Sequence, residues 1–194
     1  FTLSNLEPGQ YMVRAQKTGY VLQSYGSRRP GMGAGTTLTL SPGQEMTNIF
    51  IKLMPQAVIT GKVLDADGEP IAQCRVMALQ QRYMQGKKQW MPVMGGGATN
   101  DVGEYRLAQL APGKYVLQAA PMRMGFGVET TQAPKDGVEE GYVATYYPNA
   151  MDPAEAVPVD VPAGGQLSAI DFKLAKTRVF RVKGMGEGER GRRS

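Results

Sequence analysis

The chain has 194 residues, a length typical of one or two domains. It contains no histidine and one cysteine, Cys74, so Ser-His-Asp and Cys-His catalysis, histidine-ligated zinc and an intrachain disulfide are excluded. We therefore expect no catalytic site, no cofactor and no metal. Apolar runs stay well below the roughly 18 residues that span a membrane.

The net charge of +5 is concentrated at one end of the chain. Residues 1–172 contain 14 Lys and Arg against 15 Asp and Glu, a net of −1. Residues 173–194 contain 8 basic and 2 acidic residues, a net of +6. Nucleic-acid binding requires a basic footprint on the folded body, so this distribution predicts no nucleic-acid partner.

The first predicted element is a strand–turn–strand unit within residues 1–15. Apolar residues alternate with polar ones on both sides of Pro8-Gly9, which is typical of half-buried strands joined by a tight turn. The same unit returns in residues 105–119, where Leu, Leu, Pro, Gly, Tyr and Ala recur at an offset of 104. Residues 42–53 match residues 163–174 at an offset of 121. Repetition at this spacing predicts tandem domains.

Between the two copies, further strands and turns are expected. From Ala57 onward, alternating Ile59, Gly61 and Val63 indicate a strand, which residues 65–70 end with a turn. Residues 73–85 are rich in helix formers, but the spacing of the turns favours a strand, and tertiary context often overrides local propensity. We predict a strand there, and a turn at residues 99–104.

These elements predict an all-β protein made of tandem antiparallel β-sandwiches of the immunoglobulin or transthyretin kind. Residues 1–55 are expected to be the C-terminal part of a first, truncated sandwich. Residues 56–176 would form a second, complete sandwich. Residues 177–194 would contain the start of a further strand and a disordered basic tail, because residues 184–194 have no apolar pattern.

Four segments resemble the carboxypeptidase regulatory-like domain: Val58–Val63, Asp67–Ile71, Asn100–Leu107 and Leu110–Tyr115. The resemblance covers residues 57–120, with residues 1–20 as the tail of a preceding copy. It implies a transthyretin-like sandwich within the wider carbohydrate-binding-like fold. It also implies an extracytoplasmic accessory module, not a peptidase, of a kind that occurs in tandem.

Three short patterns have a functional and a structural interpretation. Asp65–Glu69 is similar to half of a calcium loop, but the distant carboxylate is missing, and we expect a turn. Gly95-Gly96-Gly97 lacks the Lys-Ser or Lys-Thr of a phosphate loop, and we expect a hairpin tip. Lys62, Glu104 and Asp171 contain the groups of an intramolecular isopeptide bond, but strand phase predicts that Lys62 and Asp171 point outward.

Six aromatic residues lie outside the core alternation: Tyr83, Trp90, Phe126, Tyr142, Tyr146 and Tyr147. Exposed rings stack on sugars or anchor protein partners, and rings of this kind also serve as packing mass. We expect ligand contacts at Trp90, Tyr83, Tyr146 and Tyr147, in the long connections and not on the sheet faces.

The sequence therefore predicts a non-catalytic module that acts as a spacer or a binding unit. Carbohydrate or another envelope protein is the expected partner, and the expected location is periplasmic, outer-membrane associated or secreted. The alternatives are an accessory domain of a larger secreted peptidase and an extension of an outer-membrane transporter.

Overall fold

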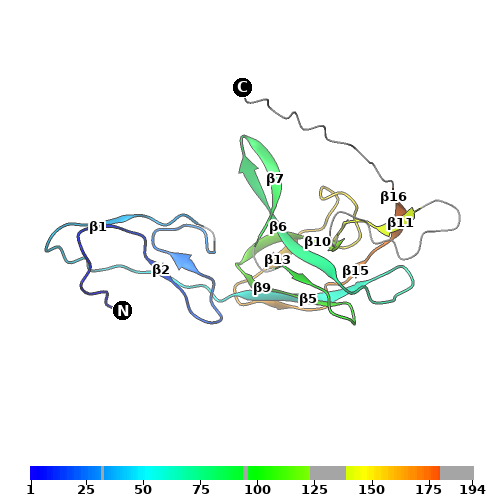
Figure 1. Ribbon diagram of the computed structural model, residues 1–194, viewed down its shortest axis with the longest axis horizontal. Helices are drawn as coiled ribbons and strands as arrows, with labels where there is room; N and C mark the ends of the chain where they lie inside the picture. Colours follow the sequence, from blue (N-terminus) through cyan, green and yellow to red (C-terminus); the bar gives the residue numbers. More distant parts are fainter. Residues whose placement is uncertain (32, 94–95, 123–138, 180–194) are drawn as a thin grey trace, which may run out of the picture.

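The computed structural model describes residues 1–31, 33–93, 96–122 and 139–179. These residues form strands and turns without a helix, so the predicted all-β class is confirmed. In this part of the chain no helix is available to cross a membrane. We refer to residues 1–55 as the N-terminal segment and to residues 56–176 as the sandwich (Figure 1).

The first sheet of the sandwich is built around two long strands that pair antiparallel along most of their length. Its strands are β6 (Cys74–Met84), β7 (Lys87–Pro92), β8 (Gly97–Ala98), β10 (Gly113–Pro121), β12 (Thr145–Tyr146) and β13 (Val159–Val161). The strand predicted for residues 73–85 is therefore confirmed, because β6 covers almost all of that range. The hairpin of β6 and β7 projects from the body of the molecule (Figure 1).

The second sheet has β5 at its centre. Its strands are β5 (Ala57–Leu64), β9 (Glu104–Leu110), β14 (Gln166–Leu167) and β15 (Phe172–Lys173). β9 pairs antiparallel with one edge of β5, and β14 and β15 pair parallel with the other. A parallel neighbour on one side and an antiparallel neighbour on the other leave β5 without a free edge over most of its length.

The core lies between the two sheets and contains the residues that alternation predicts. Ile59 and Val63 of β5 are fully buried against Leu117 of β10 and Phe172 of β15, within one cluster. Cys74 is also buried there, and burial raises the pKa of its thiol to about 12. The thiol is thus a neutral core group at physiological pH.

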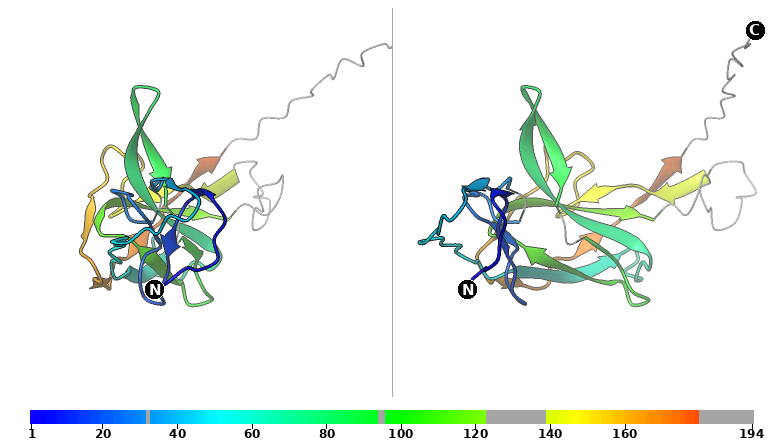
Figure 2. Two further views of the ribbon diagram at one scale, coloured as in Figure 1. Left: turned by 90° about the vertical axis from the view of Figure 1, so that its left-hand side faces the viewer. Right: turned by 60° about the vertical axis from the view of Figure 1, so that its left-hand side comes forward.

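The N-terminal segment contains two small antiparallel sheets at one end of the sandwich (Figure 2). Its strands are β1 (Gly9–Tyr11), β2 (Arg14–Ala15), β3 (Gln23–Ser24) and β4 (Leu38–Leu40). The second half of the predicted strand–turn–strand unit is therefore present as β1 and β2. The predicted strand before Pro8-Gly9 is wrong, since residues 1–6 form no strand, and residues 42–53 form none either. Val21 is the one buried apolar residue described in this segment.

The last described strand pairs with a segment of the sandwich. β16 (Lys176–Val179) lies antiparallel to β11 (Glu139–Tyr142). This strand pairs with a segment of residues 56–176. Residues 184–194, with the expected disordered tail, lie outside the described residues, as does Phe126.

The turn after β5 is closed by the carboxylate of Asp65. Its Oδ1 accepts hydrogen bonds from the backbone N–H of Glu69 at 2.9 Å and of Asp67 at 3.0 Å. The predicted turn is confirmed, and one oxygen of the candidate calcium ligand is occupied by the backbone. Gly97 lies in β8, and Gly95 is outside the described residues.

This turn predicts an acid titration. The hydrogen bond from Glu69, followed by that from Asp67, favours the charged carboxylate and holds the pKa of Asp65 below its usual value of 3.8. Because the folded-state pKa is depressed, the contribution to stability is present above the unfolded pKa and is lost as the pH falls through the folded pKa. We expect an NMR titration of the Asp65 carboxyl carbon to have its midpoint below 3.8. A midpoint at or above that value would contradict the turn assignment, and Asp65→Asn should abolish the titration.

Candidate ligand cleft

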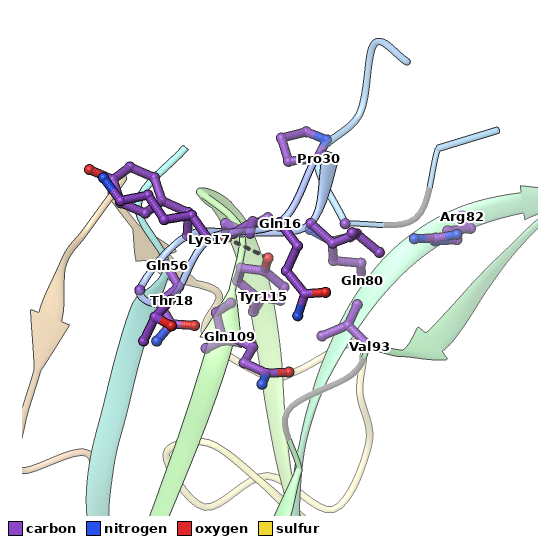
Figure 3. Close-up of a pocket in the computed structure, with 17 residues that line it drawn as sticks. Gln16, Lys17, Thr18, Pro30, Gln56, Gln80, Arg82, Val93, Gln109 and Tyr115 are labelled. Atoms are coloured by element: carbon purple, nitrogen blue, oxygen red, sulfur yellow. Dashed lines mark hydrogen bonds between the residues drawn. The ribbon is translucent and has the colours of Figure 1, made fainter. Parts of the chain in front are cut away.

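A cleft of about 420 Å³ lies between the N-terminal segment and one end of the sandwich (Figure 3). This junction cleft is lined by both regions and has both polar and apolar walls. Its lining residues are Gln16, Lys17, Thr18, Gly19, Tyr20, Val21, Leu22, Pro30, Gly31, Gln56, Gln80, Arg82, Val93, Gln109, Leu110, Ala111 and Tyr115.

The side of the cleft that belongs to the sandwich is formed where the first sheet extends beyond the apolar core. Along β6 the inward positions are apolar up to Ala78, and the next two on that side are Gln80 and Arg82. Gly113 makes room for the first of them, since a Cβ at Gly113 would lie 3.2 Å from Gln80 Nε2. The inner face of β6 therefore changes from core to polar cleft within one strand.

Tyr115 and Gln109 complete this wall. The Tyr115 hydroxyl donates a hydrogen bond to the Ala111 carbonyl oxygen at 2.6 Å, and burial raises the pKa of this phenol, so it remains neutral. Gln109 has a φ of 60°, in the left-handed region that residues other than glycine seldom adopt. Its side chain is exposed, and Figure 3 shows Gln16 reaching from the N-terminal segment toward this part of the sandwich.

Backbone hydrogen bonds hold the opposite wall in place. Val21 N–H donates to the Met54 carbonyl oxygen at 2.8 Å, and Gln56 N–H donates to the Gly19 carbonyl oxygen at 2.9 Å. These bonds tie residues 19–21 to the chain that enters β5. Lys17 is fixed above the Tyr20 ring, with Nζ 5.0 Å from the ring centroid. The wall is thus built on paired backbone.

The lining suits a neutral or anionic ligand with many hydroxyl groups. Four amide side chains, Gln16, Gln56, Gln80 and Gln109, each offer a donor and an acceptor. Lys17 supplies a positive charge, and no carboxylate occurs among the lining residues that the structure describes. Within the described residues, no three His, Cys, Asp or Glu side chains gather to hold a metal ion.

The four aromatic residues expected at a ligand site do not line this cleft, and their expected position in loops is wrong for three of them. Tyr83 lies in β6, Trp90 in β7 and Tyr146 in β12. Tyr147 follows β12 and packs edge-on against Phe172, with ring centroids 6.0 Å apart. For Trp90 the cause is the hairpin: β7 pairs with the end of β6, so a residue that appears to belong to a connection is a strand residue.

Strand register places three of these rings on the outer face of the first sheet. Tyr146 lies opposite Gln118, whose Nε2 donates to the Tyr146 hydroxyl at 2.8 Å. Trp90 lies opposite Gln81, two residues along β6 from Tyr83 and on the same face. Trp90 and Tyr146 are half-buried and Tyr83 is exposed. The outer face is therefore a second aromatic surface, separate from the junction cleft.

The structure also brings Lys62, Glu104 and Asp171 together on the surface. Lys62 Nζ lies 3.5 Å from Glu104 Oε1, and Asp171 Oδ1 accepts a hydrogen bond from the Lys62 backbone N–H at 2.8 Å. Lys62 and Asp171 are both exposed, so the outward orientation predicted from strand phase is confirmed. An exposed pair of this kind contributes about 0–1 kcal/mol to stability.

Fold and cleft together define a β-sandwich module with a polar cleft at its junction with a preceding segment. The model of the carboxypeptidase regulatory-like domain matches residues 58–175, and the chain belongs to this family. No curated protein matches the chain.

Two solved structures show weak similarity to this chain. The minor pilin GBS52 of Streptococcus agalactiae has 14% identity and a TM-score of 0.35, over 94% of this chain and 66% of the pilin. This chain therefore spans slightly less than two thirds of the pilin's length. The C-terminal fragment of the pilus adhesin SpaC of Lactobacillus rhamnosus GG has 15% identity and a TM-score of 0.23, over 91% and 80% of the two chains.

Sequence reasoning missed the junction cleft. Its glutamines are spread from position 16 to position 109, and none belongs to a motif. The one available signal was polar residues at Gln80 and Arg82, which continue the inward phase of Val76 and Ala78. By itself this signal indicates only where the core ends. The polar residues form a cleft because the N-terminal segment lies opposite them.

Proposed function

We propose that this chain is a non-catalytic binding module whose junction cleft takes a saccharide. The observation that carries the proposal is the lining, in which four amide side chains and a lysine occur together with apolar residues such as Val93 and Leu110. Amides donate to and accept from sugar hydroxyls, and apolar patches accommodate the C–H faces of a sugar ring. Membership of a regulatory-like family and the absence of histidine support a role in binding and not in catalysis.

The proposal places the module outside the cytoplasm, in the envelope or secreted, as an accessory part of a larger assembly. A spacer is the second candidate function, and the hydrogen-bonded contact between residues 19–21 and 54–56 supports it, because a held junction keeps two units at a set orientation. An accessory role in a secreted peptidase or an outer-membrane transporter is compatible with either function.

The test is a glycan array followed by calorimetry with the best oligosaccharide and the double variant Gln80→Ala/Gln109→Ala. Each amide is expected to contribute roughly 1 kcal/mol through its hydrogen bonds. Loss of both amides should weaken binding about 30-fold, since about 1.4 kcal/mol is a tenfold change. Both side chains are outside the core cluster, so the fold should survive.

Gln89→Ala is the matched control, because Gln89 is an exposed glutamine on β7 outside the cleft. Its affinity should equal that of the unmodified chain. Trp90→Ala and Tyr146→Ala test the outer face. If these two weaken binding while the glutamine pair does not, the saccharide binds the outer face and the cleft proposal fails. If no glycan binds, the spacer function replaces it.

A further inference from the structure

The N-terminal segment contains an apolar groove of about 800 Å³ that is separate from the junction cleft. We call it the strand groove. Its apolar lining includes Phe1 and Phe50, whose side chains are 84% and 81% exposed, and Leu3, which is 59% exposed. An apolar surface of this kind marks an interaction site in a soluble protein.

Strand pairing in the N-terminal segment repeats the pairing in the sandwich. β1 pairs with β4 so that Gly9 is opposite Leu40, and β10 pairs with β13 so that Gly113 is opposite Val161. These are equivalent positions in the sequence repeat, at offsets of 104 and 121. β2 and β3 pair in the same way as the far end of β10 and β12.

Local details repeat as well. The Tyr11 hydroxyl donates to the Glu7 carbonyl oxygen at 2.6 Å, as the Tyr115 hydroxyl does to Ala111. Positive φ angles also recur at equivalent positions, in the pairs Asn5 (59°) and Gln109 (60°), Gly43 (69°) and Gly164 (69°), and Asn48 (63°) and Ala169 (58°). Agreement in register, hydrogen bonds and backbone conformation points to two copies of one fold.

The sandwich shows what lies over the equivalent groove. There, β5 occupies the space between β9 and the β14–β15 edge. Tyr105 and Leu107 are buried beside it, whereas their equivalents Phe1 and Leu3 are exposed. In the N-terminal segment no described strand lies between residues 1–6 and 42–53. The strand groove is therefore the position of a β5-type strand.

We propose that the strand groove receives one extended β-strand of the β5 type, with apolar residues at alternate positions, and that this strand completes a second sandwich. The strand comes from polypeptide outside residues 1–194, because β5 is already paired on both edges in its own sheet, and the same holds in any second copy. Binding would be a β-augmentation, with affinity from main-chain hydrogen bonds and selectivity from apolar side chains.

The sandwich also identifies the backbone groups that would bind. Ile170 N–H donates to the Thr60 carbonyl oxygen at 3.2 Å, and Leu174 N–H donates to the Leu64 carbonyl oxygen at 2.8 Å. Their equivalents are Ile49 and Leu53, whose N–H groups donate no backbone hydrogen bond to another described residue. These two amides should report occupancy of the groove.

The experiment joins a strand with the sequence of residues 56–65 to Phe1 through a short Gly-Ser linker, in the full 194-residue chain. A short linker is sufficient, because Lys62 pairs with Glu104 and the end of such a strand therefore lies beside Phe1. Hydrogen exchange by NMR is then measured at Ile49 and Leu53. Exchange should slow about 100-fold, as expected when the effective concentration is about 100 times the dissociation constant.

The control fusion carries Ser in place of the residues equivalent to Ile59 and Val63, and it should give no protection. The Ile51→Asp variant should also abolish protection, since its equivalent Phe172 is buried against β5-side residues. Exchange at Leu117 checks that the sandwich is intact in every sample. Equal protection by both fusions, or none with the apolar strand, overturns the proposal. Protection of the unfused chain through dimerisation also overturns it, in favour of a second copy.

Discussion

Replacing Phe172 with Ala is expected to lower the free energy of unfolding of the sandwich by about 3–5 kcal/mol. Phe172 is fully buried on β15. Its ring packs against Tyr105 at 5.9 Å and Tyr147 at 6.0 Å between centroids. The substitution removes an aromatic contact set and leaves a cavity that the flanking strands cannot close, because β15 is held to β5 by its register.

Urea unfolding followed by Trp90 fluorescence measures this change. Phe50→Ala is the matched control, because Phe50 is 81% exposed in the described structure and its loss should change stability by at most about 0.5 kcal/mol. Equal effects of the two substitutions would show that Phe172 does not lie in the core.

Replacing Gly61 with Ala is expected to destabilise the sandwich by about 3 kcal/mol, near the upper end of the usual cost of overpacking. A Cβ on Gly61 would overlap the carbonyl oxygen of Ile170 and would lie 3.0 Å from Cε1 of Tyr105. The same carbonyl oxygen accepts a hydrogen bond from the Tyr105 hydroxyl at 2.6 Å. Relief of the overlap would therefore displace both the connection between β14 and β15 and a buried tyrosine.

The same unfolding measurement tests this substitution. Gly9→Ala is the control, because its added Cβ would meet only Tyr11, at an ordinary 3.8 Å. It should change stability by at most about 0.5 kcal/mol. A Gly61→Ala variant as stable as the unmodified chain would mean that the backbone at Ile170 moves away without cost.

Much of the sandwich was predictable because its signals are local. Alternation identified the buried faces around Ile59 and Leu107, and the turn residues at 65–70 marked where β5 ends. For β6 the helix formers in residues 73–85 gave the opposite signal. Pairing with β10 and β7 overrode it, since hydrogen bonds on both edges outweigh small differences in intrinsic propensity.

Local reasoning placed Tyr83, Trp90 and Tyr146 in connections, whereas the structure places them in strands. Tyr147 packs in the sandwich, Trp90 and Tyr146 share a sheet face, and none of the three lines the junction cleft. Turn positions alone do not show whether a residue belongs to a connection, because the lengths of the strands must also be known. The strand at 73–85 was predicted, but β7 (Lys87–Pro92), which carries Trp90, was not.

The sequence by itself determined the all-β class and the phase of the core strands, because side-chain alternation and turn chemistry act over a few residues. The family was indicated by the resemblance of four segments. Only the tertiary structure decided the parallel placement of β14 and β15 beside β5, the need for Gly61 and the junction cleft. The physical reason is that these features depend on contacts between residues far apart in the chain. Gln16 and Gln109 line one cleft because two separate sheets end there, and their spacing in the sequence does not predict this proximity.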